Sequence, residues 1–114
     1  MEVQMNKIIF VDIDETICKT PESREYEYAV PIKENIDVIN QLYEAGNTII
    51  YWTARGSTSG LDWSELTTKQ FEQWGVKYHD LRFGKPHYDI FIDDKNVNSE
   101  DFFNNKETKK YANR

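Results

Sequence analysis

The stretch Phe10-Val11-Asp12-Ile13-Asp14-Glu15-Thr16 decides how the rest of the sequence is interpreted. It joins an apolar run rich in β-branched residues, Lys7 to Val11, to two aspartates. The run has no polar alternation, which is typical of a strand buried on both faces of a parallel sheet. Ligands bind at the carboxyl ends of such strands. Because side chains alternate along a strand, Asp12 and Asp14 are expected on the same side. Two carboxylates that close favour a cation, a shared proton or a reaction, and Mg²⁺ is the cation that suits them; the alternative is a solvated turn with two surface acids.

The composition indicates one domain, residues 1–114, with a net negative charge. A chain of 114 residues can bury a hydrophobic core without disulfides or structural metal. Fourteen basic against twenty acidic residues give a net charge of −6, which disfavours nucleic acid or an anionic membrane as partner. The single cysteine, Cys18, has no partner for an internal disulfide, so a reducing compartment is expected. No signal peptide or transmembrane pattern is visible, and we expect a cytoplasmic protein.

Hydrophobic spacing predicts alternating strands and helices in the first half of the chain. Residues 17–30 show no clear period and are predicted to form a loop or small hairpin beside the two aspartates. Pro31 opens a helix that Gly46 closes, with an apolar face at Ile32, Ile36, Ile39, Leu42 and Tyr43. Asn47–Trp52 is then a second buried strand, which we expect to lie parallel to the first through a right-handed connection.

A second helix is predicted after a polar loop. Asp62 and Glu65 resemble a capping pair at its start, and Gly75 ends it. One stripe of this helix holds Trp63, Leu66, Gln70 and Trp74. The helical spacing of the two tryptophans favours a place in the core over a stacking surface.

The remaining sequence predicts three further elements. Val76–Phe83 is an extended stretch, Tyr88–Ile92 is another buried strand, and a short helix follows that Asn98 or Ser99 caps. Residues 104–114 are predicted to be a polar C-terminal tail. The alternation of strands and helices predicts an α/β fold, with a doubly wound parallel sheet in three layers.

Polar residues follow each expected strand: Asp12 and Asp14, then Thr53, then Lys85, then Asp93 and Asp94. In a doubly wound sheet these positions converge on one edge. Phosphoryl transfer uses this set of groups. One carboxylate can attack phosphorus, and a second can carry a proton. A magnesium ion held by carboxylates offsets the charge of the phosphate, while a hydroxyl and an ammonium group bind its oxygens.

The chain resembles the haloacid dehalogenase (HAD) superfamily in four motifs, which occur in the family's order between about Lys7 and Phe103: Asp12-Ile13-Asp14-Glu15-Thr16, Thr53, Lys85 and Asp93-Asp94. The segment Phe83-Gly84-Lys85-Pro86-His87-Tyr88-Asp89-Ile90-Phe91-Ile92-Asp93-Asp94-Lys95 is similar to small phosphatases of capsule and surface-polysaccharide gene clusters. The resemblance implies a Rossmann-like core and a Mg²⁺-dependent phosphatase. Its substrate would be a sugar phosphate or another small phosphorylated metabolite.

The resemblance also implies a role for each catalytic position. Asp12 would be the nucleophile that becomes an aspartyl phosphate. Asp14 would be the general acid and base. Thr53 and Lys85 would hold the phosphoryl group, with Lys85 also steadying Asp12.

The implied magnesium ligands come from both ends of the chain. Asp12 would bind the metal through its side chain, and Asp14 through its backbone carbonyl. Asp93 would bind it directly, whereas Asp94 would act through water or pair with Lys85.

Substrate contacts outside the motifs are expected from the loops. The resemblance suggests Arg55, and Lys19 and Arg24 lie in the segment expected to hang over the site. Glu15 departs from the family, which usually has glycine there, so its side chain either crowds the phosphate-facing turn or points outward. The length leaves no room for an inserted cap domain. We therefore expect either a large substrate or a homo-oligomer in which a second subunit closes the open site.

Two other interpretations use much of the same sequence. A receiver domain also has an acidic cluster, Mg²⁺, a threonine followed by alanine, and a lysine followed by proline. Thr53-Ala54 and Lys85-Pro86 fit that pattern. Its phosphorylated aspartate lies on a middle strand before the threonine, however, and no expected strand between Asp14 and Thr53 ends in aspartate. A HAD-like binding or regulatory module without catalysis is the second alternative, and Glu15 is its only support.

Overall fold

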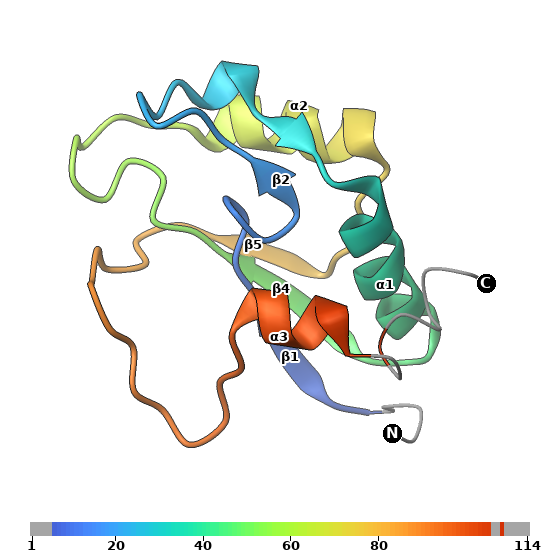
Figure 1. The fold of residues 1–114 in the computed structure, drawn as a ribbon. Helices are drawn as coiled ribbons and strands as arrows, with labels where there is room; N and C mark the ends of the chain where they lie inside the picture. The colour runs from blue at the N-terminus through green and yellow to red at the C-terminus, as the bar shows by residue number, and fades with distance from the viewer. Residues whose placement is uncertain (1–5, 106–107, 109–114) are drawn as a thin grey trace.

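The computed structural model describes residues 6–105 and residue 108 (Figure 1). Nine elements follow one another in the described chain: β1 (Ile8–Val11), β2 (Cys18–Lys19), the 3₁₀ turn η1 (Tyr26–Tyr28), β3 (Val30–Pro31), α1 (Lys33–Glu44), β4 (Thr48–Trp52), α2 (Ser64–Trp74), β5 (Asp80–Arg82) and α3 (Ser99–Asn104). The predicted polar tail, residues 104–114, lies mostly outside the described residues, although Asn104 closes α3.

The main sheet has three parallel strands in the order β1-β4-β5. Phe10 pairs with Ile50, and Trp52 pairs with Arg82. Parallel neighbours need a crossover, which α1 supplies between β1 and β4 and α2 supplies between β4 and β5. The predicted α/β class and the parallel pairing of the first two strands are confirmed.

The core lies between one face of this sheet and the helices α1 and α2. Tyr51 on β4 packs its ring edge-on against Phe71 on α2, with 4.9 Å between ring centroids. Burial of this apolar surface is the main force that holds the helices on the sheet. The buried cluster includes Val11, Ile36, Ile39, Leu42, Ile49, Tyr51, Phe71 and Trp74.

The opposite face of β1 is exposed among the described residues, whereas Ile50, which pairs with Phe10, is buried. Ile8 is 71% exposed and Phe10 is 51% exposed, although Phe10 contacts the ring of Trp52. The prediction that the first strand is buried on both faces is therefore wrong for this face. A doubly wound arrangement needs helices on each side of the sheet, and the described residues do not confirm such an arrangement.

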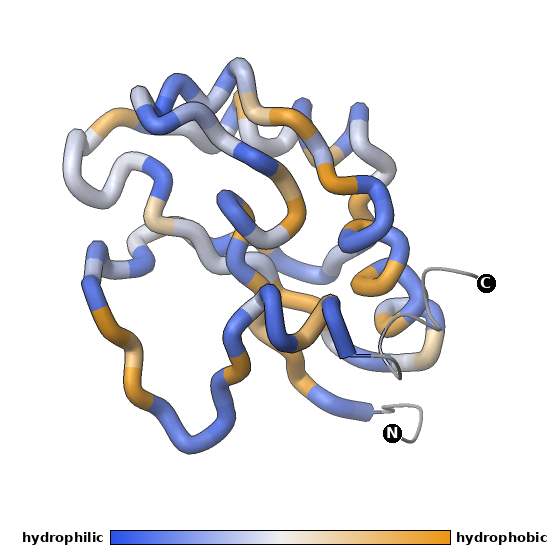
Figure 2. The backbone as a smooth tube through the Cα atoms, viewed as in Figure 1, coloured by the Kyte–Doolittle hydropathy of each residue, from blue (hydrophilic) through white to orange (hydrophobic). Residues whose placement is uncertain are grey.

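The predicted strand Tyr88–Ile92 is also absent. It belongs to a long loop, residues 83–98, in which Ile90 is 77% and Ile92 is 92% exposed. Figure 2 shows hydrophobic positions in this loop where it projects from the molecule. An apolar run predicts burial, but a strand forms only where a neighbouring strand accepts its backbone hydrogen bonds.

Local signals for turns and helix ends are mostly confirmed. Gly75 ends α2 in the left-handed conformation with φ of 68°, as a C-terminal glycine commonly does. The Asn98 side chain accepts a hydrogen bond from the backbone N–H of Glu100 and caps α3. At the start of α2, Asp62 accepts the Ser64 N–H at 2.9 Å, but the cap position itself is Trp63, whose side chain makes no capping bond.

The segment between β1 and α1 forms the small hairpin that the sequence predicts. β2 and β3 pair antiparallel, Cys18 with Pro31 and Lys19 with Val30. Within the described ranges, none of the helices has the length and apolar character needed to cross a bilayer.

Candidate active site

Asp12 and Lys85 meet where the sheet strands end. Asp12 directly follows β1, and its Oδ1 lies 3.4 Å from the Nζ atom of Lys85. Thr16 donates its hydroxyl to the other carboxylate oxygen at 3.5 Å. Lys85 is held in place because its backbone N–H donates to the Thr53 carbonyl at 3.1 Å. The two motif positions, 73 residues apart in the sequence, are therefore neighbours.

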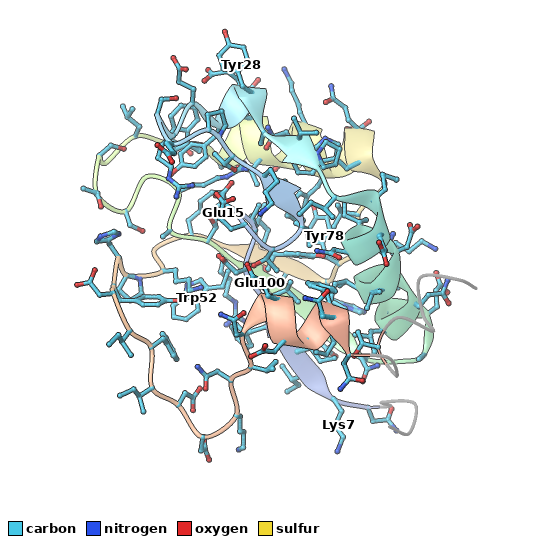
Figure 3. The ribbon with its side chains drawn as sticks, viewed as in Figure 1. Lys7, Glu15, Tyr28, Trp52, Tyr78 and Glu100 are labelled. Atoms are coloured by element: carbon cyan, nitrogen blue, oxygen red, sulfur yellow. The ribbon has the colours of Figure 1, made fainter. Side chains whose placement is uncertain are left out.

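Lys85 also approaches two aromatic rings. Its ammonium lies 6.0 Å from the ring centroid of Trp52 and 5.4 Å from that of Tyr88. Figure 3 shows Trp52 on the side of the sheet along which the 83–98 loop runs. These rings limit the directions in which the ammonium can move and keep it near Asp12.

The electrostatics of Asp12 combine burial with a nearby cation. Burial raises the pKa of Asp12 above its ordinary value, and the Lys85 ammonium opposes part of that rise. The Asp12 side chain still keeps 39% of its surface exposed. It therefore has an accessible carboxylate oxygen beside a cation, which is the arrangement a nucleophilic carboxylate needs.

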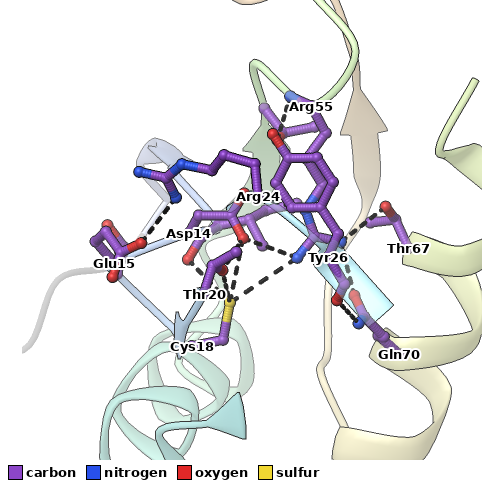
Figure 4. A network of polar contacts seen from close by, with 12 residues as sticks. Asp14, Glu15, Cys18, Thr20, Arg24, Tyr26, Arg55, Thr67 and Gln70 are labelled. Atoms are coloured by element: carbon purple, nitrogen blue, oxygen red, sulfur yellow. Dashed lines mark hydrogen bonds and ion pairs between the residues drawn. The ribbon is translucent and has the colours of Figure 1, made fainter. Parts of the chain in front are cut away.

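Asp14 is held in a different way, by the guanidinium of Arg55 (Figure 4). Arg55 Nε donates to one carboxylate oxygen at 3.1 Å and Nη2 to the other at 2.9 Å. Thr20 and Cys18 also donate to Asp14 Oδ1, the thiol at 3.5 Å. A bidentate arginine–carboxylate pair restricts both orientation and distance.

Arg55 itself is completely buried, with 0% of its side chain exposed. Nη1 donates to Thr67 at 3.0 Å and to Gln70 at 2.6 Å, and Nη2 also faces the Cys18 sulfur at 3.9 Å. The guanidinium lies 4.7 Å from the ring centroid of Tyr26. We refer to this set of residues as the Arg55 cluster: Asp14, Cys18, Thr20, Tyr26, Arg55, Thr67 and Gln70.

The cluster shifts the protonation of its members. Burial acts to raise the pKa of Asp14, but hydrogen bonds and charge from Arg55, with help from Thr20 and Cys18, hold that pKa below its ordinary value. Burial, followed by the charge of Asp14, raises the pKa of the Cys18 thiol to about 12. At neutral pH, Asp14 is thus an anion and Cys18 a neutral thiol.

Thr53 sits directly before this cluster and is 1% exposed. Its hydroxyl accepts the backbone N–H of Arg55 at 3.1 Å. The turn continues through Gly56, whose φ is 82°, and a Cβ there would come within 2.1 Å of the Leu61 carbonyl oxygen. Glycine at this position lets the chain after Thr53 fold back tightly.

An open hollow of about 960 Å³ joins the sheet end to the 83–98 loop. Asp12 and Lys85 both line this hollow. Its polar lining includes Asp12, Asp14, Glu15, Lys85, Asp89 and Asp93.

The expected metal ligands are only partly brought together. Asp93 lines the hollow, but Asp93 and Asp94 are exposed on the 83–98 loop and interact with each other. Among residues 6–105 and 108, no group of three or more histidine, cysteine, aspartate or glutamate side chains could hold a metal ion. The structure therefore pairs Asp12 with Lys85 but does not add Asp93 and Asp94 to them.

The expected substrate contacts also differ from the structure. The donors of Arg55 face protein acceptors, so the expected contact with substrate is replaced by contacts with Asp14 and α2. Arg24 pairs at the surface with Glu15 at 2.9 Å. Lys19 lines a separate hollow of about 190 Å³ beside α3.

Glu15 adopts φ of 63°, the conformation that favours glycine. A glycine at this position would adopt that backbone without strain. Of the two arrangements open to Glu15, the structure has the outward one, because its carboxylate reaches Arg24 at the surface.

Sequence reasoning missed the partners of Arg55 on α2. Thr67 is 0% and Gln70 is 5% exposed, and both accept from the same guanidinium nitrogen. The position of Gln70 in an otherwise apolar helix stripe does indicate a buried hydrogen bond, because a buried polar side chain needs a partner. The identity of that partner could not be read from spacing.

No family model matches the chain, and no curated protein matches it. Among solved structures, the chain is similar to the crystal structure of an MCSG target from Vibrio cholerae. The TM-score is 0.77, and the match covers 96% of this chain and 98% of that chain. At 22% identity the similarity concerns the fold alone, and it supports a small α/β architecture.

Proposed function

We propose that this protein is a phosphomonoester hydrolase of the HAD type, in which Asp12 is the nucleophile. The observation that carries the proposal is the accessible Asp12 carboxylate, 3.4 Å from the Lys85 ammonium at the end of a parallel strand. The Thr53 carbonyl accepts the Lys85 backbone N–H, and Asp14, two residues after Asp12, is held by Arg55. The order of these residues along the chain matches the family motifs.

The reaction follows from these groups in two halves. In the first, an Asp12 oxygen attacks phosphorus, the bond from phosphorus to the leaving oxygen breaks, and the leaving oxygen takes a proton from solvent. In the second, water attacks the phosphorylated Asp12 and gives its proton to Asp14, and phosphate leaves as the Asp12 carboxylate re-forms. Asp14 then returns that proton to solvent. Lys85 stabilises the phosphoryl oxygens through both halves. The anionic state of Asp14 suits it to accept the proton from water.

The magnesium ion is part of the proposal, although the described arrangement is not a preformed site for it. Hard carboxylate oxygens suit Mg²⁺, which would offset the charge of the incoming phosphate. Of the two aspartates after β1, Asp12 has the more accessible carboxylate, 39% exposed against 15% for Asp14, because both oxygens of Asp14 accept from Arg55. Asp93 and Asp94 would have to approach Asp12 before the family's ligand set is complete.

The approach of Asp93 to Asp12 would require a fourth strand beside β1. β1 pairs with β4 along one edge, and no described strand pairs with its other edge. The apolar segment Tyr88–Ile92 lies in the loop that borders the same hollow. If it added to β1, it would bury Phe10, Ile90 and Ile92, extend the sheet, and carry Asp93 towards Asp12. This would be a step towards the doubly wound HAD core. Hydrogen exchange of residues 88–92, with and without Mg²⁺ and vanadate, tests it: slower exchange supports docking, and unchanged exchange contradicts it.

The substrate class is proposed from access and from the resemblance. The hollow is open, and Lys85 and Asp12 line it. The phosphate group would bind at these two residues and hold the substrate in the site. A sugar phosphate or a similar small phosphorylated metabolite fits this arrangement. An open site would also suit closure by a second copy of the chain.

The direct test is steady-state phosphate release. We expect Mg²⁺-dependent turnover of p-nitrophenyl phosphate by the wild type, and turnover at background level for Asp12→Asn. Circular dichroism should show that this variant stays folded. Asp101→Asn, an exposed aspartate on α3, is the matched control and should keep the wild-type rate. Wild-type turnover that persists in Asp12→Asn would refute the nucleophile.

Two other functions predict different results in the same assay. A receiver domain would take up a phosphoryl group and hold it, with no sustained release. A catalytically silent HAD-like module would show neither uptake nor release. The incomplete set of metal ligands among the described residues is the observation that favours the silent module.

A further inference from the structure

The guanidinium of Arg55 connects three parts of the fold. It donates to Asp14 after β1, to the Cys18 sulfur on β2, and to Thr67 and Gln70 on α2. Arginine has five N–H donors, and each of them has an acceptor here. No donor remains for a substrate, and no part of the side chain is exposed.

Stability alone is a weak reason for such a buried ion pair. Removing two charges from water has a large desolvation cost, and hydrophobic residues of similar volume often stabilise a core equally well. What an apolar pair cannot supply is direction. The guanidinium is planar and contacts both Asp14 oxygens, and a lysine at the same position would supply one point charge without that fork.

The Arg55 side chain also contacts the loop that contains Tyr26. Arg55 packs over the Tyr26 ring, and Gln70 donates its Nε2 to the Tyr26 carbonyl at 2.7 Å. Tyr26 in turn packs edge-on against Trp63, with 5.1 Å between ring centroids. The loop before β3 is thus attached to α2 next to the guanidinium that holds Asp14.

We propose that Arg55 is a positioning residue that aims the Asp14 carboxylate at the water attacking phosphorylated Asp12. This inference deepens the proposed function and rests on it. In that step the water oxygen forms a bond to phosphorus, the bond from phosphorus to Asp12 breaks, and Asp14 takes the water proton. Misplacing a catalytic group by about 1 Å can reduce a rate on the order of 100-fold.

The test is the pre-steady-state burst with p-nitrophenyl phosphate and Mg²⁺, because nitrophenolate leaves without needing a proton. Arg55→Lys is expected to reduce kcat on the order of 100-fold without raising KM. Its burst should approach one nitrophenolate per enzyme, since phosphorylated Asp12 accumulates. Arg82→Lys, which alters a surface pair with Asp80, is the matched control and should behave as the wild type. A slowed first phase without a burst would overturn the inference.

A double variant keeps the test readable if Arg55→Lys does not fold. Asp14→Asn combined with Arg55→Met leaves no buried charge in this pair. If Arg55 acts through Asp14, the double variant should have the same residual kcat and burst as Asp14→Asn alone. A further loss would refute the inference. If the wild type shows no turnover, the proposed function is refuted. If the wild type turns over and Arg55→Lys has the same kcat, only the role of Arg55 is refuted.

Discussion

The Arg55 cluster and the 83–98 loop both border the hollow at the sheet end, but they are opposite in character. In the cluster, Arg55 is fully buried and each of its donors has an acceptor. In the loop, Ile92 is 92% exposed and Asp93 lies in solvent. Part of the expected site is therefore preorganised by buried polar contacts, whereas Asp93 and Asp94 are carried by the exposed part of the loop.

The two regions differ in how much free energy is needed to change their geometry. Buried polar networks hold one geometry strongly, because any break leaves a desolvated group without a partner. Exposed segments cost little to move. Asp14, the proposed proton acceptor, is thus held in advance, and we expect ligand binding to act on the loop that carries Asp93.

The largest expected effect on stability is in the cluster. Arg55→Met leaves the Asp14 carboxylate buried without its partner, so the free energy of unfolding should fall by about 3–5 kcal/mol. Arg82→Met removes a pair whose two side chains are each about half exposed, and it should change stability by about 0–1 kcal/mol. Urea denaturation of both variants measures the difference. Equal losses would show that the Arg55 pair is as exposed to solvent as the surface pair.

A smaller effect, on chemical reactivity, distinguishes the two regions by thiol alkylation. Cys18 is 0% exposed, and burial raises its pKa to about 12, so native protein at pH 8 should resist iodoacetamide. Ile90→Cys places a second thiol on the 83–98 loop, where Ile90 is 77% exposed, and this thiol should react at the rate of unfolded protein. Mass spectrometry after tryptic digestion reads both sites. Rapid native labelling of Cys18 would contradict a closed cluster.

Deprotonation of Cys18 also has a defined pH dependence. Its folded pKa lies above its unfolded value, so the folded state favours the neutral thiol. The stability that this thiol contributes is fully present below the unfolded pKa, and it is lost as the pH rises through the window up to about 12. Cys18→Ser, measured in urea melts at pH 7 and pH 10, should show a smaller decline with pH than the wild type.

The smallest effect is expected in the loop. Ile92→Ala should alter the free energy of unfolding by no more than about 0.5 kcal/mol without Mg²⁺, because the side chain is already in solvent. Ile49→Ala is the matched substitution in the core, where Ile49 is 0% exposed, and it should cost about 2–5 kcal/mol. A loss above about 1 kcal/mol for Ile92→Ala would mean that the segment is already packed without ligand, which would contradict the exposure of Ile92.

The elements that sequence reasoning predicted correctly are those with local causes. Helix α1 follows from apolar residues at helical spacing, and Gly75 ends α2 because a left-handed residue is needed there. The meeting of Asp12 and Lys85 was also predictable, since parallel strands end at a common edge. The role of Arg55 was not, because its partners Thr67 and Gln70 lie on another helix and spacing says nothing of which buried polar groups will meet.

By itself, the sequence determined an acidic α/β chain with a strand that ends in Asp12 and Asp14, because hydrophobic periodicity and turn residues act over short distances. Only the tertiary structure decided that Asp14 would be held by Arg55 and that Tyr88–Ile92 would remain uncovered. The physical reason is that pairing and burial depend on a neighbour. An apolar run is stable when it is buried, and a buried charged side chain requires a partner. The packing of distant segments determines whether that burial or that partner is available.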